Sequence, residues 1–153
     1  MLHVILFEPE IAANAGAIGR TCVAAGATLC LVRPLGFRLD DRNRRRAGLD
    51  YWEHLELRVV DSLAEALAPF PPERIWAFTT RGTQDYSRAT YASGDALVFG
   101  PESRGLPAGW LDTLPPGQRL QIPMRPEARS LNLANAVSIG LYEACRQVGW
   151  PFG

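Results

Sequence analysis

Residues 96–107 read Ala-Leu-Val-Phe-Gly-Pro-Glu-Ser-Arg-Gly-Leu-Pro, a short apolar run followed by a loop rich in glycine and proline. Four consecutive apolar residues before such a break are typical of a strand that is buried on both faces. Gly100 lets another group approach the backbone closely, and the prolines fix the path of the chain. The loop therefore has a defined shape, and it carries a carboxylate, Glu102, close to a guanidinium, Arg104.

A second stretch near the carboxyl end repeats this design. A strand end at 120–122 leads into a loop that contains Pro123 and Pro126, and then into a helix expected at about 131–148. Polar side chains mark the start of that helix at Ser130, Asn132 and Asn135. Polar, rigid loops at the carboxyl ends of strands build the ligand crevices of open α/β sheets. The two loops are therefore candidates for the walls of one crevice.

Similar apolar runs earlier in the chain predict four more strands, at 2–7, 28–32, 57–60 and 74–78. A helix is expected at about 15–25 with Asn14 as its cap, and another at 63–68 with Ser62 as its cap. This alternation predicts an α/β fold with a mostly parallel sheet of about six strands and helices on both faces. We expect residues 1–153 to form a single domain with no RNA-binding extension.

The charge pattern favours local rather than overall attraction for nucleic acid. The formal net charge is zero, and all 16 cationic side chains are arginine. A chain without net positive charge contacts RNA through local patches. The strongest patch is the run 38–46, in which five arginines stand against two aspartates. Such a run is often a solvated face, but its place after a strand end also favours contact with phosphate groups.

Several enzyme classes lack their sequence signatures in this chain. No Gly-x-Gly-x-x-Gly follows the first strand, and no phosphate-binding loop with lysine is present. His3 and His54 have no partners at the spacing of a metal site or a nucleophile set. The cysteines are odd in number and widely spaced, which predicts buried free thiols at Cys22, Cys30 and Cys145. No signal peptide or transmembrane run appears, so we expect a cytoplasmic protein.

Three segments together resemble a known family. They are Asn14-Ala-Gly-Ala-Ile-Gly-Arg20, the loop at 99–107, and the segment from Ile122 through Arg129-Ser-Leu-Asn-Leu-Ala-Asn-Ala136. These are similar to the three motifs of the SpoU (TrmH-type) branch of the SPOUT superfamily, which are S-adenosylmethionine-dependent RNA 2′-O-ribose methyltransferases. Three further segments resemble its minimal TrmL type, which acts on the wobble nucleotide of tRNA: Phe7-Glu-Pro-Glu-Ile11, Arg45-Arg-Ala-Gly-Leu-Asp50 and Tyr142-Glu-Ala144. The resemblance covers nearly the whole chain.

The resemblance implies a cofactor, a partner and a topology. The methyl donor would be S-adenosylmethionine, with S-adenosylhomocysteine as product and no metal; the partner would be tRNA. A carboxyl-terminal trefoil knot would form the dimer contact. The chemistry suits a crevice with few titratable groups, because a sulfonium donor has a neutral leaving group and mainly needs an aligned nucleophile. The last helix is apolar nearly all round, which independently predicts a second subunit as its cover and hence a homodimer.

The same resemblance implies roles for individual residues. Contacts with the cofactor would come from Phe78, Gly100, Ile122, Ser130 and Leu131, and support of the loops from Asn14, Glu102, Asn132 and Asn135. Arg20 would act on the ribose hydroxyl beside the partner subunit's cofactor. Because guanidinium stays protonated, we expect it to orient the 2′-oxygen and to stabilise developing negative charge. Candidate RNA contacts are Arg42, Arg44, Arg45, Arg46, Arg81 and Tyr142, although Tyr142 fits an ordinary half-buried tyrosine equally well.

The predicted reaction is methyl transfer to the ribose 2′-hydroxyl of the wobble nucleotide, a cytidine or modified uridine, in the anticodon loop. One alternative is the same chemistry at another tRNA position or on rRNA. The other is a non-catalytic RNA-binding dimer. Arg20 and Glu102 argue against the second alternative, since a pure binder needs neither in its crevice.

Overall fold

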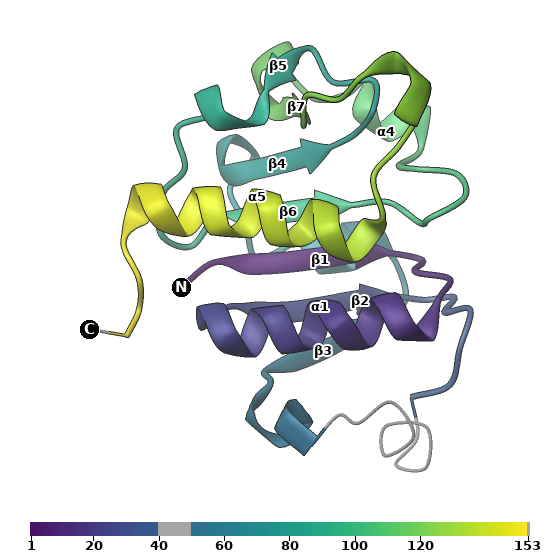
Figure 1. Ribbon diagram of the computed structural model, residues 1–153, viewed down its shortest axis with the longest axis vertical. Coiled ribbons are helices and arrows are strands. Elements are labelled where there is room, and N and C mark those ends of the chain that lie inside the picture. The colour runs from purple at the N-terminus through teal and green to yellow at the C-terminus, as the bar shows by residue number, and fades with distance from the viewer. Residues whose placement is uncertain (40–49, 153) are drawn as a thin grey trace.

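The computed structural model describes residues 1–39 and 50–152, which form a seven-stranded sheet with helices on both faces (Figure 1). The strands are β1 (His3–Phe7), β2 (Thr28–Val32), β3 (Leu57–Val60), β4 (Ile75–Phe78), β5 (Gln84–Asp85), β6 (Ala96–Phe99) and β7 (Arg119–Gln121). Their order across the sheet is β3-β2-β1-β6-β4-β7-β5, and every neighbouring pair is parallel. The predicted α/β class with a parallel sheet is confirmed.

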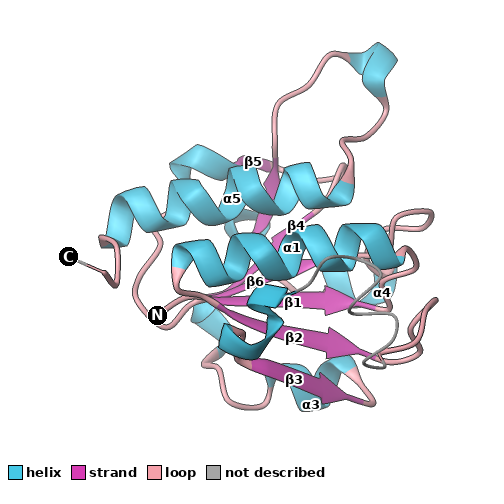
Figure 2. Cartoon of the chain, turned by 60° about the horizontal axis from the view of Figure 1, so that its bottom comes forward, coloured by secondary structure: helices cyan, strands magenta, loops and turns pink. Residues whose placement is uncertain are grey.

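The helices divide between the two faces of this sheet. They are α1 (Ala12–Ala25), α3 (Leu63–Leu67), α4 (Ala108–Leu111) and α5 (Leu133–Val148), with 3₁₀ turns η1 (Asp50–His54), η2 (Pro72–Arg74), η3 (Tyr86–Arg88), η4 (Pro116–Gln118) and η5 (Pro126–Ala128). The two long helices, α1 and α5, lie side by side across one face in both views (Figures 1 and 2). The short helices α3 and α4 pack on the other face through Ala66 and Leu111.

The strands are unbroken apolar runs because each serves two cores. In β1, Val4 and Leu6 pack under α1 and α5, whereas Ile5 packs with the side chains under α3 and α4. Successive side chains of a strand point to opposite faces. A strand covered on both faces therefore has apolar residues at every position, which is the pattern that the sequence shows.

Several element bounds differ from the sequence-based expectation. The strand β5 was not predicted, and β7 ends at Gln121 rather than at residue 122. The prediction that Asn14 caps the first helix is wrong, because α1 begins at Ala12 and its cap position, Ile11, has no side-chain hydrogen bond. The last helix begins at Leu133, later than expected, with Asn132 as its cap. The Ser62 cap is confirmed, since its side chain accepts a hydrogen bond from the Glu65 backbone N–H.

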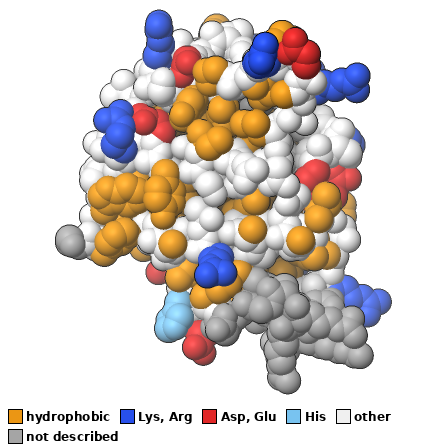
Figure 3. Space-filling model, in the orientation of Figure 1, with side chains coloured by type: hydrophobic (Ala, Val, Ile, Leu, Met, Phe, Trp, Pro, Cys, Tyr) orange, Lys and Arg blue, Asp and Glu red, His pale blue; other side chains and the backbone are white. Residues whose placement is uncertain are grey.

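One side of α5 is left open within the chain. Its buried residues, among them Val137, Leu141 and Ala144, face the sheet and α1. Ile139 and Tyr142 are exposed, so the expectation of a helix buried nearly all round is wrong for the single chain. Hydrophobic side chains gather over the end of this helix and the carboxyl-terminal residues in Figure 3. There the Tyr142 ring meets that of Trp150 edge-on, with centroids 5.0 Å apart.

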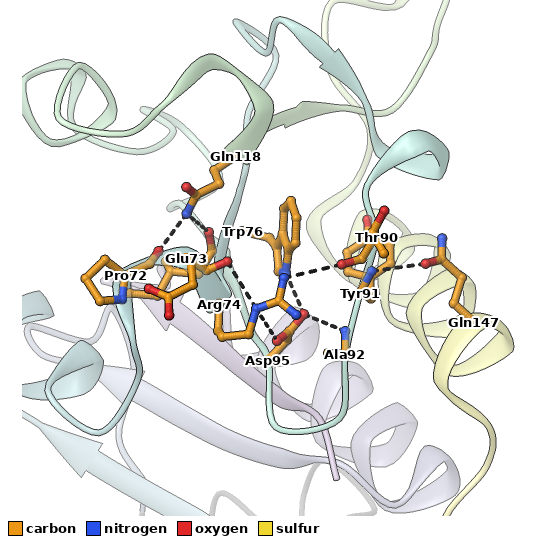
Figure 4. Close-up of polar contacts among 11 residues, drawn as sticks. Pro72, Glu73, Arg74, Trp76, Thr90, Tyr91, Ala92, Asp95, Gln118 and Gln147 are labelled. Carbon is orange, nitrogen blue, oxygen red and sulfur yellow. Dashed lines mark hydrogen bonds and ion pairs between the residues drawn. The ribbon is translucent and has the colours of Figure 1, made fainter.

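A buried carboxylate fixes the amino ends of the central strands (Figure 4). Asp95 is fully buried just before β6, and its Oδ2 accepts hydrogen bonds from Trp76 Nε1 at 2.7 Å and from the Ala92 backbone N–H at 2.8 Å. Its Oδ1 lies 3.3 Å from Nε of Arg74, and its backbone carbonyl accepts from the His3 N–H. Buried charges require such partners. The cluster therefore holds β1, β4 and β6 at the edge opposite their carboxyl ends.

The three cysteines are free and buried, as predicted. Burial raises the pKa of the Cys22 thiol to about 12 and also raises the pKa of the Cys30 and Cys145 thiols. A protonated thiol is a poor nucleophile, so none of the three suits covalent catalysis. In the part of the chain that the structure describes, no helix is long and apolar enough to cross a membrane.

Candidate active site

A pocket of about 450 Å³ lies over the carboxyl ends of the neighbouring strands β6, β4 and β7. Its walls come from the loops that follow these strands and from the start of α5. All five residues predicted to contact the cofactor line it: Phe78, Gly100, Ile122, Ser130 and Leu131. The loop that leads into α5 stands away from the body of the molecule in Figure 2. The pocket therefore unites the end of β4 with residues of all three motif segments, and the first segment contributes through Asn14.

The floor of the pocket is aromatic. The rings of Phe78 and Phe99, the last residues of β4 and β6, stack with centroids 4.5 Å apart and an interplanar angle of 19°. Gly140 of α5 packs on this pair, since a Cβ added there would lie 2.6 Å from Cε1 of Phe78. Only glycine lets the helix approach so closely. The stacked rings of the pocket floor are thus packed directly against α5.

The loop at 100–106 folds back on itself over Gly100. A Cβ at this position would collide with the backbone of Gly105 and Leu106. The Gly105 N–H bonds to the Pro101 carbonyl at 3.0 Å, which closes the loop. The guanidinium of Arg81 donates to the Leu106 carbonyl at 3.2 Å and so joins this loop to the one that follows β4. Arg81, a predicted RNA contact, thus lies at the pocket rim and braces two walls.

Glu102 acts as the missing cap of α1. Its Oε1 accepts a hydrogen bond from the Glu10 backbone N–H at 2.8 Å, and its Oε2 accepts one from the Ile11 N–H at 2.9 Å. The first N–H groups of a helix have no partner within the helix, and they favour negative charge. Since Ile11 offers no cap of its own, the carboxylate from the β6 loop supplies it.

The predicted supporting residues form one connected network. Glu102 Oε2 accepts from Asn14 Nδ2 at 3.1 Å, and Asn14 Oδ1 accepts from Asn132 Nδ2 at 3.1 Å. Asn132 Oδ1 in turn accepts from the Asn135 backbone N–H at 3.2 Å. The network ties the β6 loop to the first turns of α1 and α5. The side chain of Asn14 therefore bonds to two distant residues and not to its own helix.

Two more contacts join the loop that follows β1 to the loop that follows β6. The Glu10 carboxylate accepts from the Ser103 N–H and hydroxyl, each at 2.7 Å, and these bonds lower the pKa of Glu10 below its usual value. Arg104 pairs with Glu8 at 2.9 Å. Sequence reasoning did not assign a role to Glu8, Glu10 or Ser103. Nothing local indicates these pairs, because their members are more than 90 residues apart.

Sequence reasoning also missed Arg129, which lines the pocket next to Ser130. Arg129 has φ 64° and ψ −49°, and the Ser130 N–H bonds to the Ala128 carbonyl across it at 2.7 Å. This is a γ-turn, a strained conformation for a residue other than glycine. The turn sets the direction in which Ser130 and Leu131 enter the pocket wall.

The remaining predicted site residues lie elsewhere. Arg20 is exposed on α1 and does not line the pocket of its own chain. Its guanidinium lies over the ring of Tyr51, with Cζ 6.0 Å from the ring centroid. Tyr142 is 41% exposed near the other end of α5. The predicted contacts Arg42, Arg44, Arg45 and Arg46 lie outside the described residues.

Comparison with known proteins gives consistent matches. The profile of the SpoU rRNA Methylase family matches residues 1–142. A tRNA (cytidine(34)-2′-O)-methyltransferase of Escherichia coli K12 is 48% identical over 151 residues, which are 99% of this chain and 96% of that protein. A solved structure concerned with 2-OH methylation of C/U34 on tRNA superposes with a TM-score of 0.88 at 50% identity, covering 96% of this chain and 95% of that one.

A second solved structure shows a relative with its cofactor. It is the SpoU methyltransferase AviRb from Streptomyces viridochromogenes in complex with AdoMet. It superposes with a TM-score of 0.78 at 27% identity, covering 96% of this chain and 57% of that one. Among the described residues no group of three or more His, Cys, Asp or Glu side chains could hold a metal ion.

Proposed function

Because this chain belongs to the SpoU rRNA Methylase family, we propose that it transfers a methyl group from S-adenosylmethionine to the ribose 2′-hydroxyl of tRNA nucleotide 34. The nucleotide is a cytidine or a modified uridine. The observation that carries the proposal is that Phe78, Gly100, Ile122, Ser130 and Leu131 line the same pocket. It lies in a chain that is 48% identical to a methyltransferase named for cytidine 34.

The pocket fits the cofactor in size and chemistry. Its volume of about 450 Å³ is typical of small-molecule sites. Ile122, Leu131 and the Phe78–Phe99 floor offer apolar walls, and Gly100 contributes to the lining as well. S-adenosylmethionine supplies an activated methyl group with a neutral leaving group. The protein therefore needs to bind, orient and exclude water, rather than to donate a proton to a leaving group.

Arg20 acts on the ribose. A guanidinium stays protonated in ordinary sites, so its roles are to orient the 2′-oxygen and to stabilise the negative charge that develops there. The proton leaves to another acceptor, for which a neighbouring RNA phosphate is suited. Glu102, Asn14 and Asn132 hold the pocket loops against α1, the helix that carries Arg20.

The active enzyme is a homodimer, in which Arg20 of one subunit serves the cofactor of the other. Arg20 does not line the pocket of its own chain, and the exposed Ile139 and Tyr142 leave one side of α5 open to a partner. The tRNA contacts come from Arg42, Arg44, Arg45, Arg46, Arg81 and Tyr142, and the protein acts in the cytoplasm. Binding of an unpaired anticodon loop suits single-strand recognition through stacked bases and the 2′-hydroxyl.

The direct experiment is methyl transfer from radiolabelled S-adenosylmethionine to total tRNA and, separately, to rRNA. We expect label in tRNA, and loss of that label with Arg20→Ala at unchanged cofactor affinity. The family is named for rRNA methylation, so label in rRNA alone would keep the chemistry and replace the substrate. Cofactor binding without transfer to either RNA would favour the non-catalytic RNA-binding dimer.

A further inference from the structure

The turn η1 packs against the helix that carries Arg20. Trp52 of this turn is buried against Gly19 of α1, where an added Cβ would lie 2.6 Å from Cζ3 of the indole. An alanine at position 19 would displace the ring. The turn therefore meets α1 at a glycine immediately before Arg20 in the sequence.

Tyr51 of the same turn contacts the helical turn that ends at Arg20. Its hydroxyl donates a hydrogen bond to the Gly16 carbonyl at 2.5 Å. In an α-helix that carbonyl is also the acceptor of the Arg20 backbone N–H. The Tyr51 ring lies under the Arg20 guanidinium at 6.0 Å, within the range of cation–π attraction. Tyr51 thus contacts α1 at two points, the Gly16 carbonyl and the Arg20 guanidinium.

No carboxylate among residues 1–39 and 51–152 forms an ion pair with Arg20. Arg20 is exposed, and a long exposed side chain loses rotamer freedom when it is fixed on a substrate. A side chain whose rotamers are already restricted in the free enzyme loses less conformational entropy when the substrate binds, and this favours the reaction.

We propose that Tyr51 is a positioning residue for Arg20: its ring holds the guanidinium in the orientation that meets the ribose, and its hydroxyl fixes the ring on the Gly16 carbonyl. This proposal rests on the role of Arg20 given under Proposed function. Tyr51 does not line the cofactor pocket, so cofactor affinity does not depend on it. An alternative role for Tyr51 is to stack its ring on an anticodon base. In that role Tyr51 would affect the affinity for tRNA and not the orientation of Arg20.

Single-turnover methyl transfer, with enzyme in excess over tRNA and with saturating cofactor, measures the step that Arg20 serves. Tyr51→Leu removes ring and hydroxyl, whereas Tyr51→Phe keeps the ring. We expect the rate constant to fall roughly two- to fivefold in Tyr51→Leu, as for loss of an exposed cation–π contact, and less in Tyr51→Phe. The KM values for tRNA and cofactor stay unchanged. In an Arg20→Lys background Tyr51→Leu should lower the rate by a smaller factor, because the pair is already altered.

Trp52→Phe is the matched control, since it loosens the packing of the same turn on Gly19 and leaves Tyr51 in place. A merely structural role predicts that Trp52→Phe and Tyr51→Leu lower the rate and the melting temperature together, by factors that do not depend on the residue at position 20. That result would overturn the proposal. A raised KM for tRNA at an unchanged rate constant would also overturn it and would assign the ring to base stacking.

The contact can also be measured without activity. The Arg20 Nε–Hε resonance, assigned by its loss in Arg20→Lys, should shift and become more mobile in Tyr51→Leu, and less so in Tyr51→Phe. An unchanged resonance in Tyr51→Leu overturns the positioning role even in an active enzyme. If the resonance responds as expected but the native protein methylates no RNA, the proposed function fails, and the positioning role fails with it.

Discussion

At the scale of single residues, Gly100 determines whether the pocket can form. Its missing side chain lets the β6 loop fold back over it, and a Cβ would collide with the backbone of Gly105 and Leu106. Gly100→Ala should therefore weaken cofactor binding at least tenfold, or roughly 1.4 kcal/mol, as measured by calorimetric titration. Gly109→Ala in α4 is the control, because an added Cβ meets nothing within 4 Å there. Equal affinities in both variants would contradict this account of the loop.

The Glu10 carboxylate links stability to pH. The Ser103 hydrogen bonds lower the pKa of Glu10 in the folded protein. The ionised carboxylate therefore adds to the free energy of unfolding above its ordinary pKa of 4.5, and this addition is lost as the pH falls through the lowered pKa. The free energy of unfolding of Glu10→Gln should therefore fall less steeply than that of the native protein below about pH 4.5. Urea unfolding at a series of pH values measures the slope. Ser103→Ala should reproduce part of the effect, whereas parallel curves for all three proteins would contradict it.

Asn14 shows what local sequence rules miss at this scale. An asparagine near a helix start is a good cap candidate, and the sequence favoured that interpretation. In the structure the cap comes from Glu102, which is 91 residues from Ile11. Asn14 is free to join Glu102 to Asn132 instead. Pairs between distant loops leave no periodic or spacing signal, which is also why Glu10 and Ser103 were not foreseen.

At the scale of elements, α1 depends on a cap from another loop. Glu102→Ala would leave the Glu10 and Ile11 N–H groups without their acceptor, which we expect to lower the free energy of unfolding by about 1–3 kcal/mol. Denaturant unfolding at neutral pH measures this difference. Glu73→Ala is the control, because this exposed glutamate at η2 should change stability by no more than about 0.5 kcal/mol. A loss in Glu102→Ala no larger than in Glu73→Ala would contradict the capping role.

The strands were predictable because they serve two cores, whereas β5 was not. The strand β5 consists of only two residues, Gln84 and Asp85, and both are polar. They form a strand because they pair with Leu120 and Gln121 of β7. Pairing with a distant strand has no signature in so short a segment. The trefoil knot implied by the family resemblance stays a prediction for the same reason, since composition and periodicity carry no information on threading.

At the scale of the whole molecule, the site follows the topology of the sheet. Loops after neighbouring parallel strands meet at one edge, so motif residues far apart in sequence gather in one pocket without any local signal of contact. The five residues assigned to the cofactor lie together in this way, and Arg20 lies apart. A second chain is the simplest means of bringing Arg20 to a pocket.

Mixed dimers test that arrangement. Arg20→Ala and Gly100→Val should each be inactive alone, but a reassorted mixture contains dimers in which one subunit supplies Arg20 and the other an intact pocket. If the site is shared between subunits, random reassortment should restore roughly a quarter of the native sites, measured as methyl transfer after joint unfolding and refolding. A mixture that stays inactive, although both chains are found in the same dimers, would place Arg20 and the pocket of one chain together.

The central claim is methylation of a single ribose oxygen, and its most direct measurement uses synthetic anticodon stem-loops that lack one 2′-hydroxyl at a time. Methyl transfer from labelled S-adenosylmethionine should disappear when nucleotide 34 is a deoxynucleotide. It should persist when the deoxynucleotide is at 33 or 35, because the nucleophile at 34 is intact. Label that persists in the stem-loop with a deoxynucleotide at 34, or that is lost only with a substitution elsewhere, would contradict the account.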